Sequence, residues 1–317
     1  MIATAWKVLR RDGRELLGFD DAQALAVSGG ILVVNLDVFD ESTDWLPGMT
    51  LREVGWRSVI AAVSDVLVKG ARPLGLMLGL GVPDSVAESI EELFVGIQEA
   101  CDTYGVRVWG GDLGSSDHLY LAVTAIGIAE RVVARRGARP GECVMITGPV
   151  GFTPVVYGVL LDGSRMCRGF REAIEVAYRP RLVDPEFWLA ACKYATAAID
   201  NSDGLALTLH YLAESSGVKL VIEDLPLTEC LVECAGEWGV DPVEMALYMS
   251  GEEYSFIFTV KPGNVREVAA LAEKYGVEVH RIGRVEEGCG VYMKGLGRVE
   301  KRGWLHFKGW ASAELED

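Results

Sequence analysis

The sequence is poor in the side chains that proteins commonly use for zinc binding and acid–base chemistry. Its 317 residues include four histidines and seven cysteines, and these form neither an HExxH pattern nor a CxxC pair. The odd number of cysteines and their spread argue against a zinc site and against a disulfide framework. Cys230 and Cys234 lie four residues apart, which on a helix would place both on one face as small packing residues. We therefore expect chemistry that does not centre on histidine.

The sequence also lacks long apolar runs and clusters of positive charge. No stretch approaches the roughly 20 apolar residues that span a bilayer, and the N-terminal MIATAWKVLRRDGREL has no signal-peptide core. The 46 acidic residues outnumber the 30 basic ones and give a net charge of −16, which repels a nucleic-acid backbone. We expect a soluble, cytoplasmic protein whose partners include neither a membrane nor a nucleic acid.

The hydrophobic content is high, at 50%, and the length favours two domains of roughly 100 to 200 residues each. In the first half, apolar periodicity predicts strands at 31–36, 73–82 and 119–129 and helices at 51–70 and 83–105. A Pro- and Gly-rich segment at 135–151 marks a boundary, which gives domains 1–137 and 138–317. The second half is predicted to mix helices at 203–216, 241–249 and 263–276 with strands at 218–222, 254–261 and 277–283. The predicted fold is α/β (α+β) with two domains.

Two adjacent acids, Asp20 and Asp21, stand in the stretch GFDDAQAL just before an apolar run. If this stretch is extended, neighbouring side chains leave opposite faces, so one carboxylate points to solvent and the other to the core. A carboxylate in the core needs a compensating cation. The alternative is a turn, in which aspartate is common.

Further acids stand at the ends of predicted elements or among apolar residues. They are Asp37 at the end of ILVVNLD, Asp65 within an apolar helix, Asp112 in WGGDLG, and Asp200 and Asp203 in AIDNSDGL. Each has a structural alternative, such as a helix N-cap for Asp203, a Gly-Gly turn for Asp112 and an exposed helix edge for Asp65. Together they resemble the all-oxygen surroundings that Mg²⁺ prefers when it also binds phosphates.

Two glycine-rich stretches, GGD at 110–112 and TGPVG at 147–151, could bring backbone N–H groups close to an anion. Neither is a Walker A loop or a kinase catalytic loop. The candidates for phosphate contacts are Arg135, Arg136, Arg179 and Arg181, and for each the alternative is a solvated surface position.

The order of these motifs resembles that of the thiamine-monophosphate kinase family, whose superfamily includes aminoimidazole ribonucleotide synthetase. The motifs are GFDDAQAL, VVNLD, AVSDVLVKGARP, WGGDLG, RRGARPGE, AIDNSDGLALTLHYLAESSG and MSGEEYSFIFTV. The most specific are IDNSDGL and SGEEY, which look like the family's I-D-x-S-D-G-L and G-G-E-D-Y. The resemblance implies ATP-dependent phosphorylation of thiamine monophosphate to thiamine diphosphate by direct in-line transfer, with several Mg²⁺ ions.

The resemblance also implies a role for individual residues. The implied metal ligands are Asp20, Asp21, Asp37, Asp65, Asp112, Asp200 and Asp203. The implied ATP contacts are Tyr104, Gly111, Asp112, Arg135 and Ser202, and the implied substrate contacts are Asp44, Glu252 and Trp310. No general acid or base is implied, because the attacking phosphate oxygen is already ionised at neutral pH. Trp45 and Trp310 are candidates for an aromatic face beside the substrate rings, with core packing as the alternative.

Five positions depart from the family pattern. Asn35 and Leu36 stand where hydroxyl residues are usual, Asp44 replaces a histidine, Ser250 a glycine and Glu253 an aspartate. These departures bear on the number of ions and on the choice of substrate.

The resemblance further implies a homodimer in which the N-terminal sheets pair to form a barrel, with ATP in the cleft between the two domains of each chain. The alternatives are another ATP-dependent enzyme of the superfamily, similar to aminoimidazole ribonucleotide synthetase, and a non-catalytic protein that binds nucleotide or metal.

Overall fold

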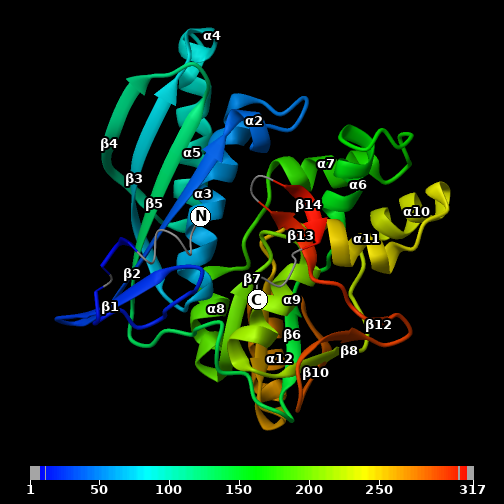
Figure 1. Ribbon diagram of the computed structural model, residues 1–317. Helices are drawn as coiled ribbons and strands as arrows, with labels where there is room; N and C mark the ends of the chain where they lie inside the picture. Colours follow the sequence, from blue (N-terminus) through cyan, green and yellow to red (C-terminus); the bar gives the residue numbers. More distant parts are fainter. Residues whose placement is uncertain (1–7, 11, 306–307, 313–317) are drawn as a thin grey trace.

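Two large β-sheets organise the chain, one built from residues 23–129 and the other from residues 143–298 (Figure 1). The protein is seen here as a computed structural model that describes residues 8–10, 12–305 and 308–312. A short hairpin of β13 (Arg302–Leu305) and β14 (Gly309–Ser312) follows the second sheet. The predicted mixed α/β class is confirmed.

The N-terminal sheet has the strand order β1-β2-β5-β3-β4. Its strands are β1 (Gln23–Val27), β2 (Gly30–Asp40), β3 (Arg72–Val82), β4 (Arg107–Ser115) and β5 (Tyr120–Ala129). All neighbouring strands are antiparallel except β3 and β4, which are parallel. A parallel pair requires a crossover connection, and helices α4 (Asp84–Ala87) and α5 (Ile90–Tyr104) provide it.

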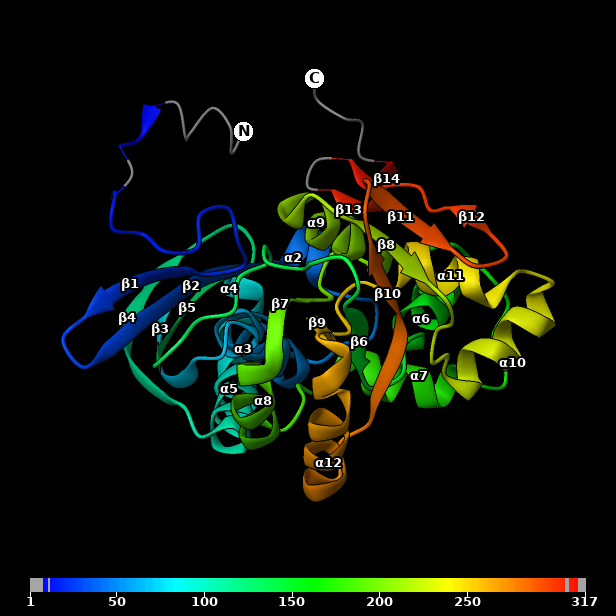
Figure 2. The same cartoon turned by 90° about the horizontal axis from the view of Figure 1, so that it is seen from below.

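Helix α3 (Leu51–Val68) lies between this sheet and the second half of the chain, as Figure 2 shows. A capping box of Thr50 and Glu53 fixes its N-terminus. The helix is apolar on most sides because it packs against β2, β5 and α5 and also against β7 (Ala195–Asp200) and α8 (Pro185–Ala191). Among the described residues, no helix is long and apolar enough to span a bilayer, and this includes α3.

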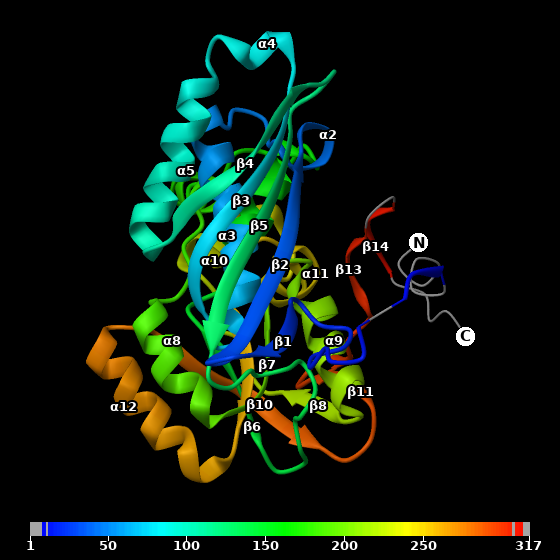
Figure 3. The same ribbon diagram turned by 90° about the vertical axis from the view of Figure 1, so that its left-hand side faces the viewer.

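The opposite face of the N-terminal sheet carries no helix of the described chain, and Figure 3 looks onto this face. Leu36 on β2 is 59% exposed there and Met77 on β3 is 41% exposed. Both pair in register with Thr124 on β5, so they flank it on the same face. The edge strand β4 is exposed along nearly its whole length. The sheet therefore offers an apolar face and a free edge for further packing.

The C-terminal sheet has the strand order β12-β11-β8-β10-β6-β9-β7. In addition to β7, its strands are β6 (Cys143–Thr147), β8 (Lys219–Ile222), β9 (Phe256–Val260), β10 (Val279–Glu286), β11 (Gly290–Met293) and β12 (Gly297–Arg298). The helices of this half, besides α8, are α6 (Phe152–Leu160), α7 (Phe170–Tyr178), α9 (Leu205–Ser216), α10 (Glu229–Trp238), α11 (Pro242–Met249) and α12 (Val265–Tyr275). Helix α9 packs on β7, β8 and β11 and also contacts β13, so it brings the C-terminal hairpin to the end of β7.

Most predicted elements of the first half are present within a few residues of their predicted ends. The helix predicted at 83–105 is interrupted and forms α4 and α5. The structural alternative of a Gly-Gly turn at Asp112 is wrong, because residues 110–112 lie inside β4. Pairing with β3 overrides the low strand propensity of glycine there. The domain division at residues 137 and 138 falls between the two sheets and stays a prediction.

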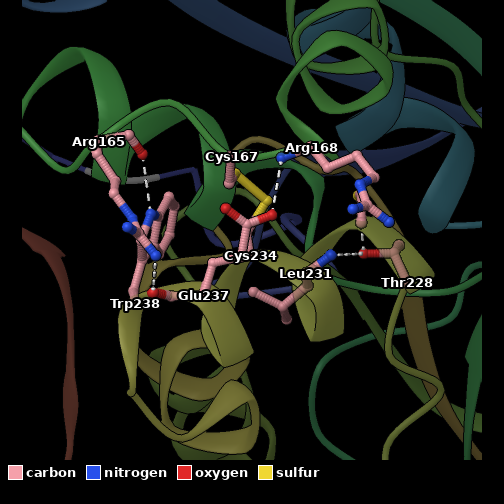
Figure 4. Close-up of a disulfide and its surroundings, with 9 residues drawn as sticks. Arg165, Cys167, Arg168, Thr228, Leu231, Cys234, Glu237 and Trp238 are labelled. Carbon is pink, nitrogen blue, oxygen red and sulfur yellow. Dashed lines mark hydrogen bonds between the residues drawn. A yellow bond between two sulfur atoms is a disulfide. The ribbon is translucent and has the colours of Figure 1, made fainter.

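A disulfide joins Cys167, in the loop before α7, to Cys234 on α10 (Figure 4). The interpretation of Cys234 as a simple packing residue is therefore wrong, although one disulfide beside five free cysteines is not the disulfide framework that the sequence argued against. The two cysteines are 67 residues apart, and no local spacing links them. Cys230 on the same helix is a free, buried thiol, as expected. A second bond, from Trp238 Nε1 to the Arg165 carbonyl at 2.9 Å, also ties this loop to α10.

Candidate functional site

The NSD loop after β7 and the SGEEY loop before β9 lie side by side. The N–H group of Glu252 donates to the Ser202 carbonyl at 2.7 Å, and that of Tyr254 donates to the Asn201 carbonyl at 2.9 Å. The buried Asn201 amide adds a bond to the Ser250 carbonyl at 2.6 Å. Glu252 and Tyr254 have positive φ angles of 58° and 54°, which cost non-glycine residues on the order of 1 kcal/mol each. The two most specific motifs thus fold into one unit that holds a strained backbone.

Three carboxylates meet beside these loops. One oxygen of each of Asp21, Asp65 and Asp200 lies within 4.8 Å of the others. Ser64 Oγ donates to Asp200 Oδ2 at 2.6 Å, whereas Asp200 Oδ1 is buried and has no hydrogen-bond partner among the described residues. Burial and the neighbouring Asp200 raise the pKa of Asp65 well above its usual value, and burial together with Asp21 raises the pKa of Asp200 to about 7. A divalent cation would relieve both the repulsion and the unsatisfied oxygen.

Asp20 and Asp21 already have positively charged partners within the protein. Lys69, the C-cap residue of α3, is fully buried, and its Nζ lies 2.6 Å from Asp20 Oδ1 and 2.5 Å from Asp21 Oδ2. Arg135 Nε donates to Asp21 Oδ1 at 2.7 Å, and the Arg135 backbone N–H donates to Asp20 Oδ2 at 2.8 Å. Burial opposes the charged form of Lys69, but Asp21 and Asp20 outweigh it and raise the pKa of Lys69.

These contacts decide between the two interpretations of GFDDAQAL. Residues 16–22 form bends, so the pair does not lie in an extended strand, and the segment is closer to the turn interpretation. The expectation of one solvent-facing carboxylate is wrong, because no strand carries the pair and the side chains of Asp20 and Asp21 are 1% and 2% exposed. Both carboxylates therefore need the compensating cations that Lys69 and Arg135 provide.

A cavity of about 350 Å³ adjoins the NSD and SGEEY loops. The predicted site residues that line it are Asp37, Asp44, Ser202, Asp203, Glu252 and Trp310. They include all three of the residues implied as substrate contacts and two of those implied as metal ligands. Burial raises the pKa of Asp37 to about 6, and the negative charge of Asp203 adds to the rise. The hydrogen bond from the Val38 backbone N–H lowers the pKa and so opposes this rise. The carboxylates of the cavity therefore repel one another electrostatically.

Aromatic rings form another part of the cavity lining. The rings of Tyr157 and Trp310 lie 5.7 Å apart, and those of Trp304 and Trp310 lie 6.0 Å apart in an edge-on arrangement. Trp45 also lines the cavity, and its Nε1 donates to the Met49 carbonyl at 2.8 Å. Aromatic faces together with carboxylates suit a flat, positively charged ligand.

Two cavity residues that the sequence analysis missed hold Glu252 in place. Arg57 on α3 is 2% exposed, and its Nη2 lies 2.5 Å from Glu252 Oε1. Tyr157 on α6 donates its hydroxyl to Glu252 Oε2 at 2.6 Å. Neither residue belongs to a motif, and the neighbours of each in its helix are mostly apolar. A charged residue within the apolar sequence of α3 was the available signal for Arg57.

Glu253, a departure from the family pattern, has a structural role in this chain. Its carboxylate accepts bonds from the N–H groups of Gly151 and Thr153, both at 3.0 Å, and from Thr153 Oγ1 at 3.2 Å. These donors belong to the N-terminus of α6, the helix that carries Tyr157. Burial raises the pKa of Glu253 to about 7, although the bonds from Thr153 and Gly151 oppose the rise.

Four of the five residues implied as ATP contacts do not line the cavity: Arg135 binds Asp21, and the other three lie elsewhere in the chain. Tyr104 is buried in α5, where its hydroxyl accepts the Leu182 N–H at 2.8 Å and its ring meets Trp56 edge-on. Gly111 and Asp112 lie on the exposed edge strand β4. Asp112 is also absent from the cluster of Asp21, Asp65 and Asp200.

The remaining candidate arginines have other contacts. Arg136 donates to the Leu16 carbonyl at 2.9 Å. Arg179 pairs with Glu99 at 2.9 Å and stacks 4.4 Å above Trp56. Arg179 and Arg181 both line a second cavity of about 500 Å³.

Comparison with known proteins assigns the chain to a family. Residues 19–129 match the AIR synthase related protein, N-terminal domain, and residues 139–295 match the C-terminal domain of the same description. The thiamine-monophosphate kinase of Nitrosopumilus maritimus is 30% identical over 256 residues, which are 80% of this chain and 81% of that protein. The thiamine-monophosphate kinase of Aquifex aeolicus is 33% identical over 271 residues, 84% and 86% of the two chains.

A solved structure, AaThiL complexed with AMPPCP and TMP, matches the fold with a TM-score of 0.83 and 30% identity and covers 96% of both chains. These matches confirm the family predicted from the order of the motifs. The chain is therefore an enzyme of the thiamine-monophosphate kinase family.

Proposed function

We propose that the protein transfers the terminal phosphoryl group of ATP directly to the phosphate of thiamine monophosphate, giving thiamine diphosphate and ADP. The observation that carries the proposal is the 350 Å³ cavity, in which Asp44, Glu252 and Trp310 share one lining with the acids Asp37 and Asp203. The relatives support it, because the AaThiL structure contains TMP together with AMPPCP, an ATP analogue.

The cavity lining fits the ring system of the substrate. Thiamine carries a permanently cationic thiazolium ring next to a pyrimidine, and Trp310 with Tyr157 offers aromatic faces for stacking and cation–π attraction. The carboxylates of Asp44 and Glu252 add negative charge to the same cavity. This combination favours a cationic ring over a neutral one, and so favours thiamine monophosphate over the substrates of other superfamily members.

The reaction needs no general base from the protein. The acceptor phosphate is ionised at neutral pH, so its oxygen can attack without losing a proton. Consistent with this, no histidine is found among the described residues that line the cavity. The contribution of the chain is to bind two phosphorylated molecules in line and to exclude water from between them.

The acidic residues fit Mg²⁺ at some predicted positions better than at others. Asp21, Asp65 and Asp200 would hold an ion, since Asp200 Oδ1 is buried without a partner, and Asp37 and Asp203 would hold ions at the cavity. Bound Mg²⁺ would supply neutralising charge, because two unit charges 4 Å apart repel by about 4 kcal/mol at an effective dielectric of 20.

Asp20 and Asp112 fit Mg²⁺ less well within this chain. Both oxygens of Asp20 are bound by Lys69 and by Arg135, and Asp112 lies on the exposed strand β4. For ATP we propose contacts with Ser202, which lines the cavity, and with Arg135, which reaches Asp21. Tyr104, Gly111 and Asp112 stay proposed ATP contacts on the family pattern alone.

We also propose a homodimer in which two N-terminal sheets face each other and close a barrel. Support comes from the uncovered sheet face with Leu36 and Met77 and from the free edge of β4. We propose the cytoplasm as the location, where ATP is available.

The proposal is tested by following thiamine diphosphate in a chromatographic assay with ATP, Mg²⁺ and increasing thiamine monophosphate. We expect product from the wild type, and Trp310→Ala should raise the KM for thiamine monophosphate about tenfold, since an aromatic face is worth roughly 1 to 2 kcal/mol. The matched control is Trp238→Ala on α10, whose indole lies outside the cavity and which should leave KM unchanged. Absence of thiamine diphosphate with the wild type would overturn the proposal.

A further inference from the structure

A lysine ammonium is buried in the acidic site. Lys69 is 0% exposed, and its Nζ contacts three oxygens: Asp20 Oδ1 at 2.6 Å, Asp21 Oδ2 at 2.5 Å and the Ala198 carbonyl at 2.8 Å. Two of these contacts are hydrogen bonds, to Asp20 Oδ1 and to the Ala198 carbonyl, and the contact with Asp21 Oδ2 is an ion pair. The three oxygens come from the bend at residues 16–22 and from β7, while Lys69 itself caps α3.

The charges around Lys69 balance. Asp20 and Asp21 carry two negative charges, and Lys69 and Arg135 carry two positive charges within ion-pair distance. Asp20 has no oxygen left without a protein partner, because Oδ1 meets Lys69 and Oδ2 accepts the Arg135 N–H. A divalent ion placed between Asp20 and Asp21 would have to displace an ammonium group that is covalently part of the protein.

The neighbouring carboxylates are not balanced in this way. Asp65 has no ion pair among the described residues, and Asp200 has one hydroxyl partner, Ser64, on Oδ2 only. The unsatisfied Asp200 Oδ1 is buried and belongs to the same group of oxygens as Asp21 and Asp65. One part of the acidic site is thus closed by protein cations, and the adjacent part is open.

We infer that Lys69 is a built-in cation of the phosphoryl-transfer site, which takes the place of one divalent ion between Asp20 and Asp21 and leaves the grouped oxygens of Asp21, Asp65 and Asp200 as the position for an added ion. The inference rests on the proposed function for its role in catalysis, but it concerns the ion count of the protein itself. A chelator cannot remove a covalently attached cation. The contacts of Lys69 with Asp20, Asp21 and Ala198 therefore hold residues 16–22 against α3 and β7 in the absence of metal. A metal ion at the same place would make this contact depend on the free Mg²⁺ concentration.

The test counts Mn²⁺ bound per chain by the electron paramagnetic resonance signal of free Mn²⁺, in the full-length protein with and without a non-hydrolysable ATP analogue. Lys69→Met keeps the length of the side chain and removes its charge, and Lys261→Met, at an exposed position, is the matched control. We expect Lys69→Met to bind one more Mn²⁺ per chain than the wild type and the control. In EDTA its melting temperature should fall below that of the wild type, and added Mn²⁺ should restore it. An unchanged Mn²⁺ count for a folded Lys69→Met protein would overturn the inference.

A second pair of variants applies if Lys69→Met does not fold. Asp20→Asn should leave the Mn²⁺ count of the wild type unchanged, because Asp20 is bound by protein groups alone, whereas Asp200→Asn should lower it by one. A reduced count in Asp20→Asn would make Asp20 a metal ligand and would overturn the inference. Failure of the proposed function has a different signature, since the wild type would then form no thiamine diphosphate whatever its Mn²⁺ count.

Discussion

The Arg57 guanidinium lies 2.5 Å from the Glu252 carboxylate, and this ion pair links the helix that contains Asp65 to the loop that lines the cavity. Glu252 has the strained backbone of a left-handed residue, so the pair helps to hold a conformation that the chain would not otherwise favour. The Tyr157 hydroxyl completes the arrangement from α6. The position of this cavity carboxylate therefore depends on residues from both halves of the chain.

Tyr157→Phe should weaken substrate binding without a large loss of stability. The change removes the hydroxyl that donates to Glu252 and keeps the ring that packs against Trp310. A hydrogen bond to a charged group is worth about 1.5 to 3 kcal/mol, which corresponds to a rise of roughly 10- to 150-fold in the KM for thiamine monophosphate. Steady-state kinetics measures the change, with Tyr292→Phe on β11 as the control. An unaltered KM would show that Tyr157 does not position Glu252 for substrate.

Loss of the disulfide between Cys167 and Cys234 should destabilise the protein. The bond closes a loop across 67 residues of sequence, for which chain entropy predicts a contribution of roughly 4 kcal/mol to the free energy of unfolding. Urea unfolding of a Cys167→Ser/Cys234→Ser variant tests this, with Cys289→Ser, an exposed free cysteine, as the control. Equal unfolding free energies for the wild type and the double variant would contradict the prediction.

Glu253 should make the stability of the protein fall as pH rises through the weakly acidic range. Burial raises its pKa from 4.5 to about 7 in the folded state, so between these values the folded chain holds a proton that the unfolded chain has lost. The free energy of unfolding then decreases with pH, by at most about 1.4 kcal/mol per pH unit, and the contribution is constant above about pH 7.

Urea unfolding between pH 4.5 and pH 8 measures this slope. Glu253→Gln should flatten it relative to the wild type, whereas Glu287→Gln at an exposed position should not. Parallel pH profiles for the wild type and Glu253→Gln would show that the carboxyl group does not titrate in this range.

A charge on the uncovered sheet face should break the proposed dimer. Met77→Asp places a carboxylate among apolar side chains on β3, and its burial against a second copy would cost several kcal/mol. In sedimentation velocity we expect the wild type to run as a dimer and Met77→Asp as a monomer. Val240→Asp, also at an exposed apolar position, should stay dimeric. A monomeric wild type would contradict the proposal.

Features encoded in short motifs could be predicted from the sequence. Asp44, Glu252 and Trp310 belong to separate segments, yet they line one cavity as the family pattern implies. The family could be predicted because the order of these short motifs is itself part of the sequence. Local periodicity sufficed for α3 and β3, because both segments are long and mostly apolar.

Features that depend on tertiary packing could not be predicted. Lys69 follows an apolar helix, where a lysine usually reaches solvent and complements the helix dipole, and it is buried only because residues 16–22 and β7 cover it. Cys167 and Cys234 meet because α10 packs against the loop before α7. The glycine-rich segment of β4 has a low strand propensity, and it forms a strand because it pairs with β3.

The most direct test of the central claim is a single-turnover experiment with ATP labelled in its terminal phosphate and excess thiamine monophosphate. We predict that the label appears in thiamine diphosphate without a labelled protein intermediate, that EDTA abolishes the transfer, and that Asp203→Asn slows it by orders of magnitude. ATP bound by the wild type with Mg²⁺ and thiamine monophosphate present, but with no label in thiamine diphosphate, would contradict the account.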